Sequence, residues 1–198
     1  MKNKDGVSSK RLVYWILAVS IFVAAVVVGA FVLFSKQQSK VKDIYLDSGD
    51  LLMTYTTDSN VFNVSNLSPM SDIMGMRSNN AYFDFSVAAH LDNSSEIEYE
   101  IAVQKNDGSI IDDKDIRIYL QIQDGGSYVK LFGPSYFTPL SEKSSFGAPA
   151  NSMILSKVLR KKDTTDNYRL RVWLAEDSSI TSDLSSYSLT INVYGHAK

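Results

Sequence analysis

The chain has 198 residues, no cysteine and two histidines, and its formal net charge is −2. Without cysteine it forms neither disulfides nor thiolate metal sites, and two histidines are too few for an ordinary zinc centre. Residues 1–42 hold seven basic residues and one acid, whereas residues 43–198 hold 13 basic and 21 acidic residues. We expect no nucleic-acid partner, because an acidic domain repels phosphate.

A hydrophobic segment, LVYWILAVSIFVAAVVVGAFVLF, occupies residues 12–34 and contains no charged residue. A helix of that length spans about 34 Å, which is enough to cross a hydrocarbon core of about 30 Å. Tyr14 and Trp15 stand at its start, where aromatic side chains prefer the membrane interface, and basic residues flank both ends. The segment predicts one transmembrane helix between a tail (1–11) and a juxtamembrane linker (35–42), with the lipid bilayer as a partner.

Two other interpretations of the segment fit less well. A cleaved signal peptide has a shorter apolar core, and cutting after Val28-Gly29-Ala30 would leave an apolar new terminus. A prepilin signal needs a glycine directly before the apolar helix, whereas Gly6 is followed mainly by polar residues. We therefore expect an uncleaved signal anchor.

The orientation of the anchor follows from its flanks. Four basic residues precede the segment and three follow it, which favours a cytoplasmic N-terminus and an extracytoplasmic C-terminal domain. The lack of cysteine fits a bacterial cell surface, particularly a Gram-positive one, or a cytosolic domain. We expect a single-pass protein of the cell membrane.

In residues 43–198 the apolar residues recur with a period of two, which indicates β-strands. Strict alternation is typical of sheets with one buried face and antiparallel pairing, and many short strands predict an antiparallel β-sandwich, immunoglobulin-like or jelly-roll in type. The clearest strands are Tyr82–His90, Glu96–Val103, Ile116–Ile122, Tyr168–Leu174 and Tyr187–Val193, and the weaker ones are Leu51–Thr57, Val61–Leu67, Tyr128–Phe132 and Met153–Leu159.

Turn-forming residues separate the strands. Asn106–Gly108, Asp124–Gly126 and Thr164–Asn167 have the composition that turns require. Ser68–Asn80 and Gly133–Asn151 are long and irregular, and no amphipathic helix of useful length is predicted after residue 43.

One basic cluster stands out in this acidic domain. Arg160, Lys161 and Lys162 precede a strand in which Arg169, Arg171 and Trp173 share the face that the alternation predicts to be exposed. An arginine and aromatic surface is typical of binding sites, so these six residues form a possible patch for an anionic or glycan partner. The alternative is a charged hairpin turn with cross-strand partners.

Signatures of catalysis and metal binding are weak. Asp112–Asp115 could bind calcium, but it lacks the spacing of a dedicated loop and reads more simply as a solvated turn. There is no nucleophile elbow, no evident carboxylate pair and no phosphate-binding glycine loop. We predict no catalytic residue, no cofactor and no metal site.

These observations favour a membrane-anchored surface domain that acts by binding or assembly, as a subunit of an envelope complex or a surface fibre. Partners would be other proteins or further copies of the chain. One alternative is a ligand-binding module for a glycan or cation, and another is a membrane-anchored hydrolase.

Two stretches resemble known groups. Val61–Asp72, VFNVSNLSPMSD, resembles the early segment of camelysin/TasA-like surface proteins of Gram-positive bacteria, although Met70-Ser71 replaces the glycine of that family. Tyr168–Leu174 and Asn192–Gly195 resemble the end of uncharacterised single-pass membrane proteins of Firmicutes. The resemblance implies a jelly-roll-like β-sandwich at a cell surface, and it implies no activity.

Overall fold

The computed structural model describes residues 14, 44–45, 51–55, 59–79, 81–91, 96–180 and 186–197. Contacts divide the chain into Met1–Ser39 and Lys40–Lys198, and every described strand belongs to the second unit. The predicted tail, membrane helix and linker lie outside the described residues, apart from Tyr14. Within the described part of the chain, no helix has the length and apolar character needed to cross a bilayer.

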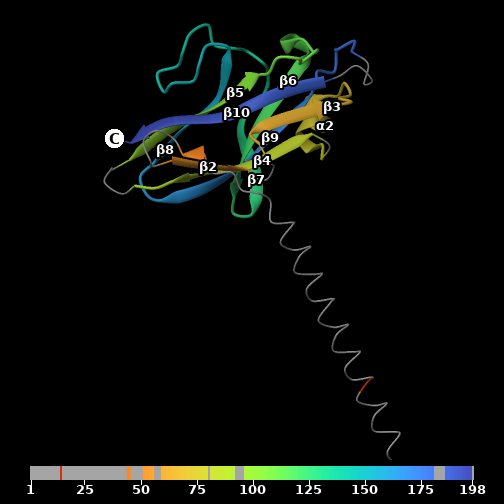
Figure 1. Cartoon of the computed structure of the whole chain (residues 1–198). Helices are drawn as coiled ribbons and strands as arrows, with labels where there is room; N and C mark the ends of the chain where they lie inside the picture. Colours follow the sequence, from red (N-terminus) through yellow and green to blue (C-terminus); the bar gives the residue numbers. More distant parts are fainter. Residues whose placement is uncertain are drawn as a thin grey trace, which may run out of the picture. The chain divides into compact units, whose positions relative to one another are not determined.

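Two antiparallel sheets pack face to face, which confirms the predicted β-sandwich (Figure 1). Each predicted strand is present. Sheet A has the order β1 (Ile44–Tyr45), β2 (Leu51–Tyr55), β4 (Tyr82–Ala89), β9 (Thr164–Leu174), β6 (Ile116–Asp124) and β7 (Ser127–Tyr136). Sheet B has the order β3 (Val61–Ser65), β10 (Ser186–Ala197), β5 (Ile97–Lys105) and β8 (Ser152–Arg160).

The pairing of strands is nested about one hairpin. β6 pairs with β7, β5 with β8, β4 with β9, and β3 with β10, so each of the four strands directly before the hairpin turn pairs with its counterpart after it. The turn itself is Gly125-Gly126, with φ of 54° and 88°, a left-handed conformation that glycine adopts without strain. The turn predicted at Asp124–Gly126 is confirmed. β1 and β2 extend sheet A beyond β4.

The core lies between the sheets and follows the predicted alternation. Along β4, every second side chain is buried, from Phe83 to Ala89, while the residues between them face outward. Each buried aliphatic or aromatic side chain contributes about 1.5–3 kcal/mol relative to exposure. Both sheets supply large, fully buried side chains to this core, and Ile111 joins them from the loop after β5. The largest are Tyr99, Tyr168, Tyr187, Ile97, Ile101, Ile111, Ile116, Ile118 and Leu120.

A polar network crosses the core between β5 and β9. The hydroxyls of Tyr99 and Tyr168 lie 2.7 Å apart, and Tyr99 donates to the Asp166 carboxylate at 2.9 Å. The same carboxylate oxygen accepts from Arg160 Nε at 2.7 Å. Because Tyr99 and Tyr168 are fully buried, this arrangement satisfies hydroxyls that would otherwise cost free energy.

One predicted turn is wrong. Thr164–Asn167 begins β9 and pairs with Ser86–Ala89 of β4, and the chain turns earlier, near Lys161–Asp163. The neighbouring strand decides the conformation here, because ladder hydrogen bonds outweigh the weak local preference of threonine, aspartate and asparagine for turns.

The two irregular stretches are partly ordered. Ser68–Asn80 contains a short helix, α2 (Asp72–Arg77), which was not predicted. The second stretch gives its first residues to β7, including Pro134, and continues as a loop from 137 to 151. Proline is tolerated in β7 because this strand lies at the edge of sheet A.

The inter-sheet network gives a first prediction. Changing Asp166 to Ala leaves two buried hydroxyls and Arg160 without their shared acceptor, and should reduce the free energy of unfolding by about 2–3 kcal/mol. Chemical denaturation measures this loss. The control is Asp163→Ala, which removes an exposed ion pair with His90 and an exposed hydrogen bond from the Leu91 backbone and should lower the denaturation midpoint much less. Equal effects of the two variants would contradict the role of the network.

A second prediction concerns alkaline pH. Burial raises the pKa of Tyr99, Tyr168 and Tyr187 above the ordinary value for tyrosine. Because the folded state holds these protons more tightly, their stabilisation is complete below a pH of about 10 and is lost as the pH rises above it. In a titration followed by tyrosinate absorbance, these three residues should ionise only together with unfolding seen by circular dichroism. Ionisation of all tyrosines in the folded state would contradict this.

Candidate functional site

The most distinctive surface lies where α2 covers the outer face of sheet A. Trp173 was predicted to point outward into solvent, and this was wrong: its side chain does leave the outer face of β9, but it is only 1% exposed. Gly75 of α2 lies directly on the indole, since a Cβ at this position would be 2.2 Å from two ring atoms. The helix therefore covers the tryptophan and is fixed by it.

An ion pair fastens the start of α2 to β6. Arg117 donates from Nε to one carboxylate oxygen of Asp72 at 3.0 Å and from a terminal nitrogen to the other at 2.6 Å. It also donates to the carbonyl of Pro134 at 3.2 Å and lies 4.3 Å from the ring centre of Tyr136. The hydrogen bond to Asp72 raises the pKa of Arg117, so the guanidinium stays charged.

Beside this ion pair is an open hollow of about 830 Å³. Its apolar wall contains Ile73, which is 61% exposed, and Tyr136, and its rim carries the exposed carboxylates of Glu176 and Asp177. Because Arg117 is paired with Asp72, the charges left to a ligand are negative. The hollow suits an apolar group next to a positive charge. Its lining is Met70, Ser71, Asp72, Ile73, Arg117, Tyr136, Ala175, Glu176 and Asp177.

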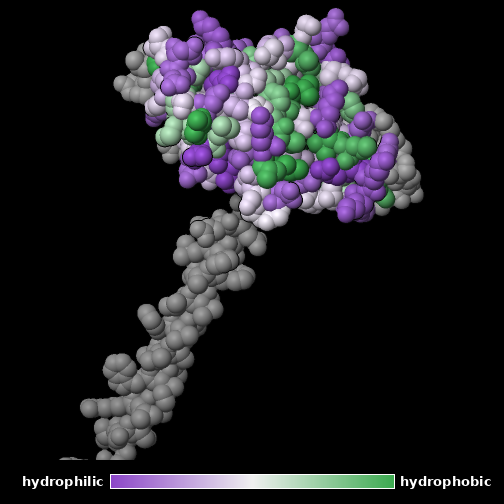
Figure 2. Space-filling model, turned by 180° about the vertical axis from the view of Figure 1, so that it is seen from behind, coloured by the Kyte–Doolittle hydropathy of each residue, from purple (hydrophilic) through white to green (hydrophobic). Residues whose placement is uncertain are grey.

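Hydrophobic residues reach the surface in separate patches among hydrophilic ones on the face seen in Figure 2. On α2, Ile73 and Met74 are adjacent exposed hydrophobic residues, and both are more than 60% exposed. Adjacent exposed hydrophobic residues beside a hollow are typical of interaction sites. We call Ile73, Met74, Tyr136, Glu176 and Asp177 the α2 surface.

The sequence held a signal for this surface that was missed. Ser71 precedes the helix, Asp72 lies in its first turn and Arg77 in its last, which is the charge order that a helix dipole favours. The signal was weak because the helix has six residues and a central glycine. Such a short helix depends on tertiary contacts for its stability, here the packing of Gly75 on Trp173 and the ion pair of Asp72 with Arg117.

The predicted basic patch is not one surface. Arg169 lies in the middle of the outer face of sheet A, bonded to both oxygens of Asp84 at 2.7 Å and stacked between Tyr82 and Tyr128 at 4.2 and 4.3 Å. Arg171 is 6% exposed and donates to Gln121 at 3.0 Å and to the carbonyl of Ser78. These two arginines are structural parts of the sheet face.

The other basic residues lie at the turn between β8 and β9. Arg160 is bonded to Asp166, and Lys161 lies 3.8 Å from Glu96, while Lys162 is exposed. The charged-hairpin interpretation thus describes this turn better than a recognition patch does, because acidic neighbours neutralise two of the three cations.

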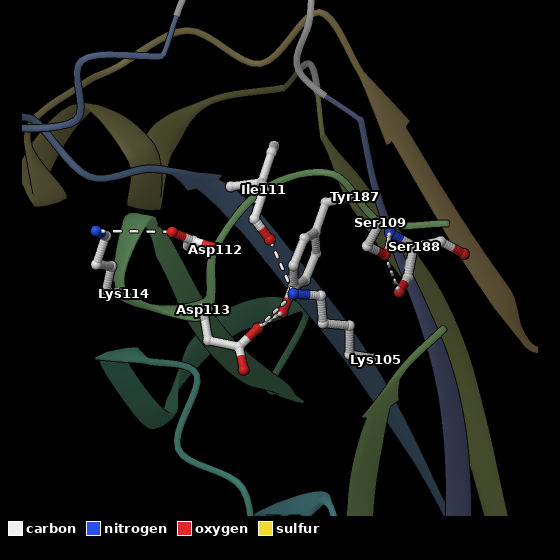
Figure 3. A network of polar contacts seen from close by, with 8 residues as sticks. All are labelled: Lys105, Ser109, Ile111, Asp112, Asp113, Lys114, Tyr187 and Ser188. Atoms are coloured by element: carbon white, nitrogen blue, oxygen red, sulfur yellow. Dashed lines mark hydrogen bonds and ion pairs between the residues drawn. The ribbon is translucent and has the colours of Figure 1, made fainter. Parts of the chain in front are cut away.

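Asp112–Asp115 forms a fixed turn, shown in Figure 3. Lys105 Nζ donates to Asp113 and to the carbonyl of Ile111, each at 2.9 Å, and Tyr187 donates to the same carboxylate at 3.3 Å. Asp112 pairs with Lys114 at 3.6 Å. Across the part of the chain that the structure describes, no group of three or more acidic or histidine side chains is placed to hold a metal ion.

Comparisons with known proteins identify no family. No protein-family model matches the chain, and no curated protein matches it. One solved structure, "AvmM Catalyzes Macrocyclization in Alchivemycin A Biosynthesis", is similar over 80% of this chain and 96% of that chain, with 10% identity and a TM-score of 0.30. A similarity at this level supports no conclusion about activity.

The contact between α2 and Trp173 gives a third prediction. Gly75→Ala places a methyl group inside the indole, so α2 must move and Trp173 becomes partly hydrated. We expect a red shift of its fluorescence and a loss of about 1–3 kcal/mol in unfolding free energy. The measurement uses a Trp15→Phe background, because Trp15 and Trp173 are the two tryptophans. Arg77→Ala, at an exposed position of the same helix, should leave the emission unchanged; equal shifts would contradict the packing role of Gly75.

Proposed function

We propose that this chain is a single-pass membrane-anchored surface protein whose β-sandwich works by binding a protein partner rather than by catalysis. The uncharged segment 12–34 and its basic flanks support the anchor, with the N-terminus in the cytoplasm and the domain outside. A Gram-positive envelope suits a cysteine-free surface domain.

Of the two predicted sandwich types, the nested strand order supports the jelly roll. In that arrangement a long hairpin is rolled up so that strands pair across its two arms. Here β3, β4, β5 and β6 pair with β10, β9, β8 and β7, respectively. We propose this fold type for the domain.

The α2 surface carries the proposal of binding. Its exposed Ile73 lines an open hollow, and the exposed Met74 follows it in the helix. The lining is acidic, since Asp72 is neutralised by Arg117 while Glu176 and Asp177 remain exposed. The fitting partner is a protein segment that presents an aliphatic or aromatic side chain beside a lysine or arginine. Desolvated apolar anchors ringed by charge pairs are the usual source of affinity and orientation at such interfaces.

The two alternatives have less support. A glycan- or cation-binding module would rely on the basic cluster, but its three arginines are already bonded within the domain. Arg169 and Arg171 bond to residues of the sheet face, and Arg160 bonds to Asp166. A hydrolase needs a carboxylate free to move a proton, and Asp72, at the edge of the hollow, has both oxygens on Arg117.

A fourth prediction tests the partner. A photo-crosslinking amino acid at position 74 of the full chain in living cells should give a discrete protein adduct. The adduct should decrease when Glu176→Gln and Asp177→Asn remove the acidic rim. The matched control is the same crosslinker at Ile110, an apolar position that is 63% exposed against 64% for Met74. Adducts of equal yield at both positions would contradict a specific α2 surface.

The anchor is tested separately by fractionation. The full chain should stay with membranes in alkaline carbonate and be cleaved by protease added to intact protoplasts. A variant lacking residues 12–34 should leave the membrane fraction. Protection of the domain in intact protoplasts would overturn the proposed orientation.

A further inference from the structure

β3 forms one edge of sheet B, and no described strand pairs with its other side. The strand has five residues, Val61–Ser65, and ends where Asn66 takes a left-handed conformation with φ of 56°. An unpaired strand edge presents backbone donors and acceptors that another strand can meet.

The hydrogen bonds of β10 show which residues of β3 face outward. Ile191 donates its N–H to the carbonyl of Asn60 at 2.9 Å, and the register then continues with Leu189 opposite Phe62. In an antiparallel strand, successive residues direct their backbone groups to opposite sides. Asn60, Phe62 and Val64 therefore face β10, and the outward residues are Val61, Asn63 and Ser65. The N–H of Val61 has a long contact of 3.3 Å with the Ser59 hydroxyl.

The other side of β10 is fixed, so this assignment holds along the strand. Ser188 accepts from the backbone N–H of Asn106 at 2.9 Å, and the Ser109 hydroxyl accepts from the Ser188 N–H at 3.0 Å. Figure 3 shows the Ser109–Ser188 contact near the Lys105–Asp113–Tyr187 group. The loop after β5 thus holds one flank of β10, and β3 is held on the other.

The longer edge strands, β7 in sheet A and β8 in sheet B, carry features that oppose pairing with another chain. β7 contains Lys130, Pro134 and register shifts in its pairing with β6. β8 carries Lys157 and Arg160, and its pairing with β5 also shifts register. Charges, proline and bulges are the usual protections of edges, and β3 has none of them.

We propose that β3 is a self-association edge, which pairs antiparallel with β3 of a second copy about an axis at Asn63. Two edge strands form hydrogen bonds only if the residues whose backbone groups point away from their own sheets lie opposite one another. With Asn63 opposite Asn63, Val61 meets Ser65 and all three outward residues are matched. The two Asn63 backbones then exchange hydrogen bonds, and the four-stranded sheet B continues into its copy.

The side chains are compatible with this pairing. Asn63 is exposed on the outer face of sheet B, where its side-chain oxygen accepts from Ser188 of β10 at 2.7 Å, so the side chain is held on that face and leaves the outward backbone groups of residue 63 to the second copy. Phe62 would lie across from Val64, and both are already buried in the core. Because β3 is uncharged, the pairing brings no like charges together in an otherwise acidic domain.

Disulfide trapping tests the pairing and its register, because the natural chain has no cysteine. Full-length Asn63→Cys, oxidised in its own membranes with copper phenanthroline, should form a covalent dimer. Paired residues of this kind have Cα atoms about 5.5 Å apart, within the range that a disulfide spans. Ser65→Cys should give about tenfold less dimer, since residue 65 would lie four residues, or about 13 Å, from its own copy.

Two further measurements complete the test. Val61→Cys and Ser65→Cys carried on chains of different size should form the mixed dimer when they are expressed together. Leu159→Cys, at the opposite edge of sheet B, reports collisions and should match Ser65→Cys. No dimer of Asn63→Cys, or equal dimer from all positions, would overturn the proposal.

The result is independent of the proposed partner binding. If the Asn63→Cys dimer fails to form while the adduct at position 74 persists, only self-association is overturned. If the dimer forms and no adduct appears, only the partner surface is overturned.

Discussion

Antiparallel pairing between the two halves of the chain is the constraint on which the rest of the structure depends. The Gly125-Gly126 turn joins the halves, and each later strand is placed by an earlier one. This puts β10, the end of the described chain, in the middle of sheet B, and leaves β3 and β8 at the edges of that sheet. The two sheets then bury their apolar faces against each other, with Tyr99, Tyr168 and Asp166 joining them through the core.

The α2 surface is a consequence of that pairing. Trp173 at the end of β9 and Arg117 on neighbouring β6 come to one place because the strands pair with Arg117 opposite Trp173. Together they hold α2, one by packing on Gly75 and the other by the ion pair to Asp72. Since Asp72 and Gly75 make the contacts with the sheet, Ile73 and Met74 are not packed in the core and remain exposed at the surface.

The proposed partner surface and the proposed dimer edge belong to different sheets. The α2 surface lies on the outer face of sheet A, and β3 is an edge of sheet B. The α2 surface takes no part in the proposed β3 pairing, so a dimer would carry two such surfaces, and two linked sites bind a repetitive partner more strongly than one does. Anchoring in a membrane would raise the local concentration of copies and so favour a short pairing of this kind.

The sequence by itself determined the presence of strands β2 to β10, the antiparallel β-sandwich and the Gly125-Gly126 turn, because alternation and glycine chemistry are local properties that survive in any arrangement of the chain. It also marked Arg169 and Arg171 as outward, but it could not show that Asp84 and Gln121 already engage them. Only the tertiary structure decided the nested strand order, the extension of β9 through Thr164–Asn167, and the burial of Trp173. Each of these depends on a neighbour far away in sequence, such as β4 for the start of β9 and α2 for the indole, and no local pattern contains that information.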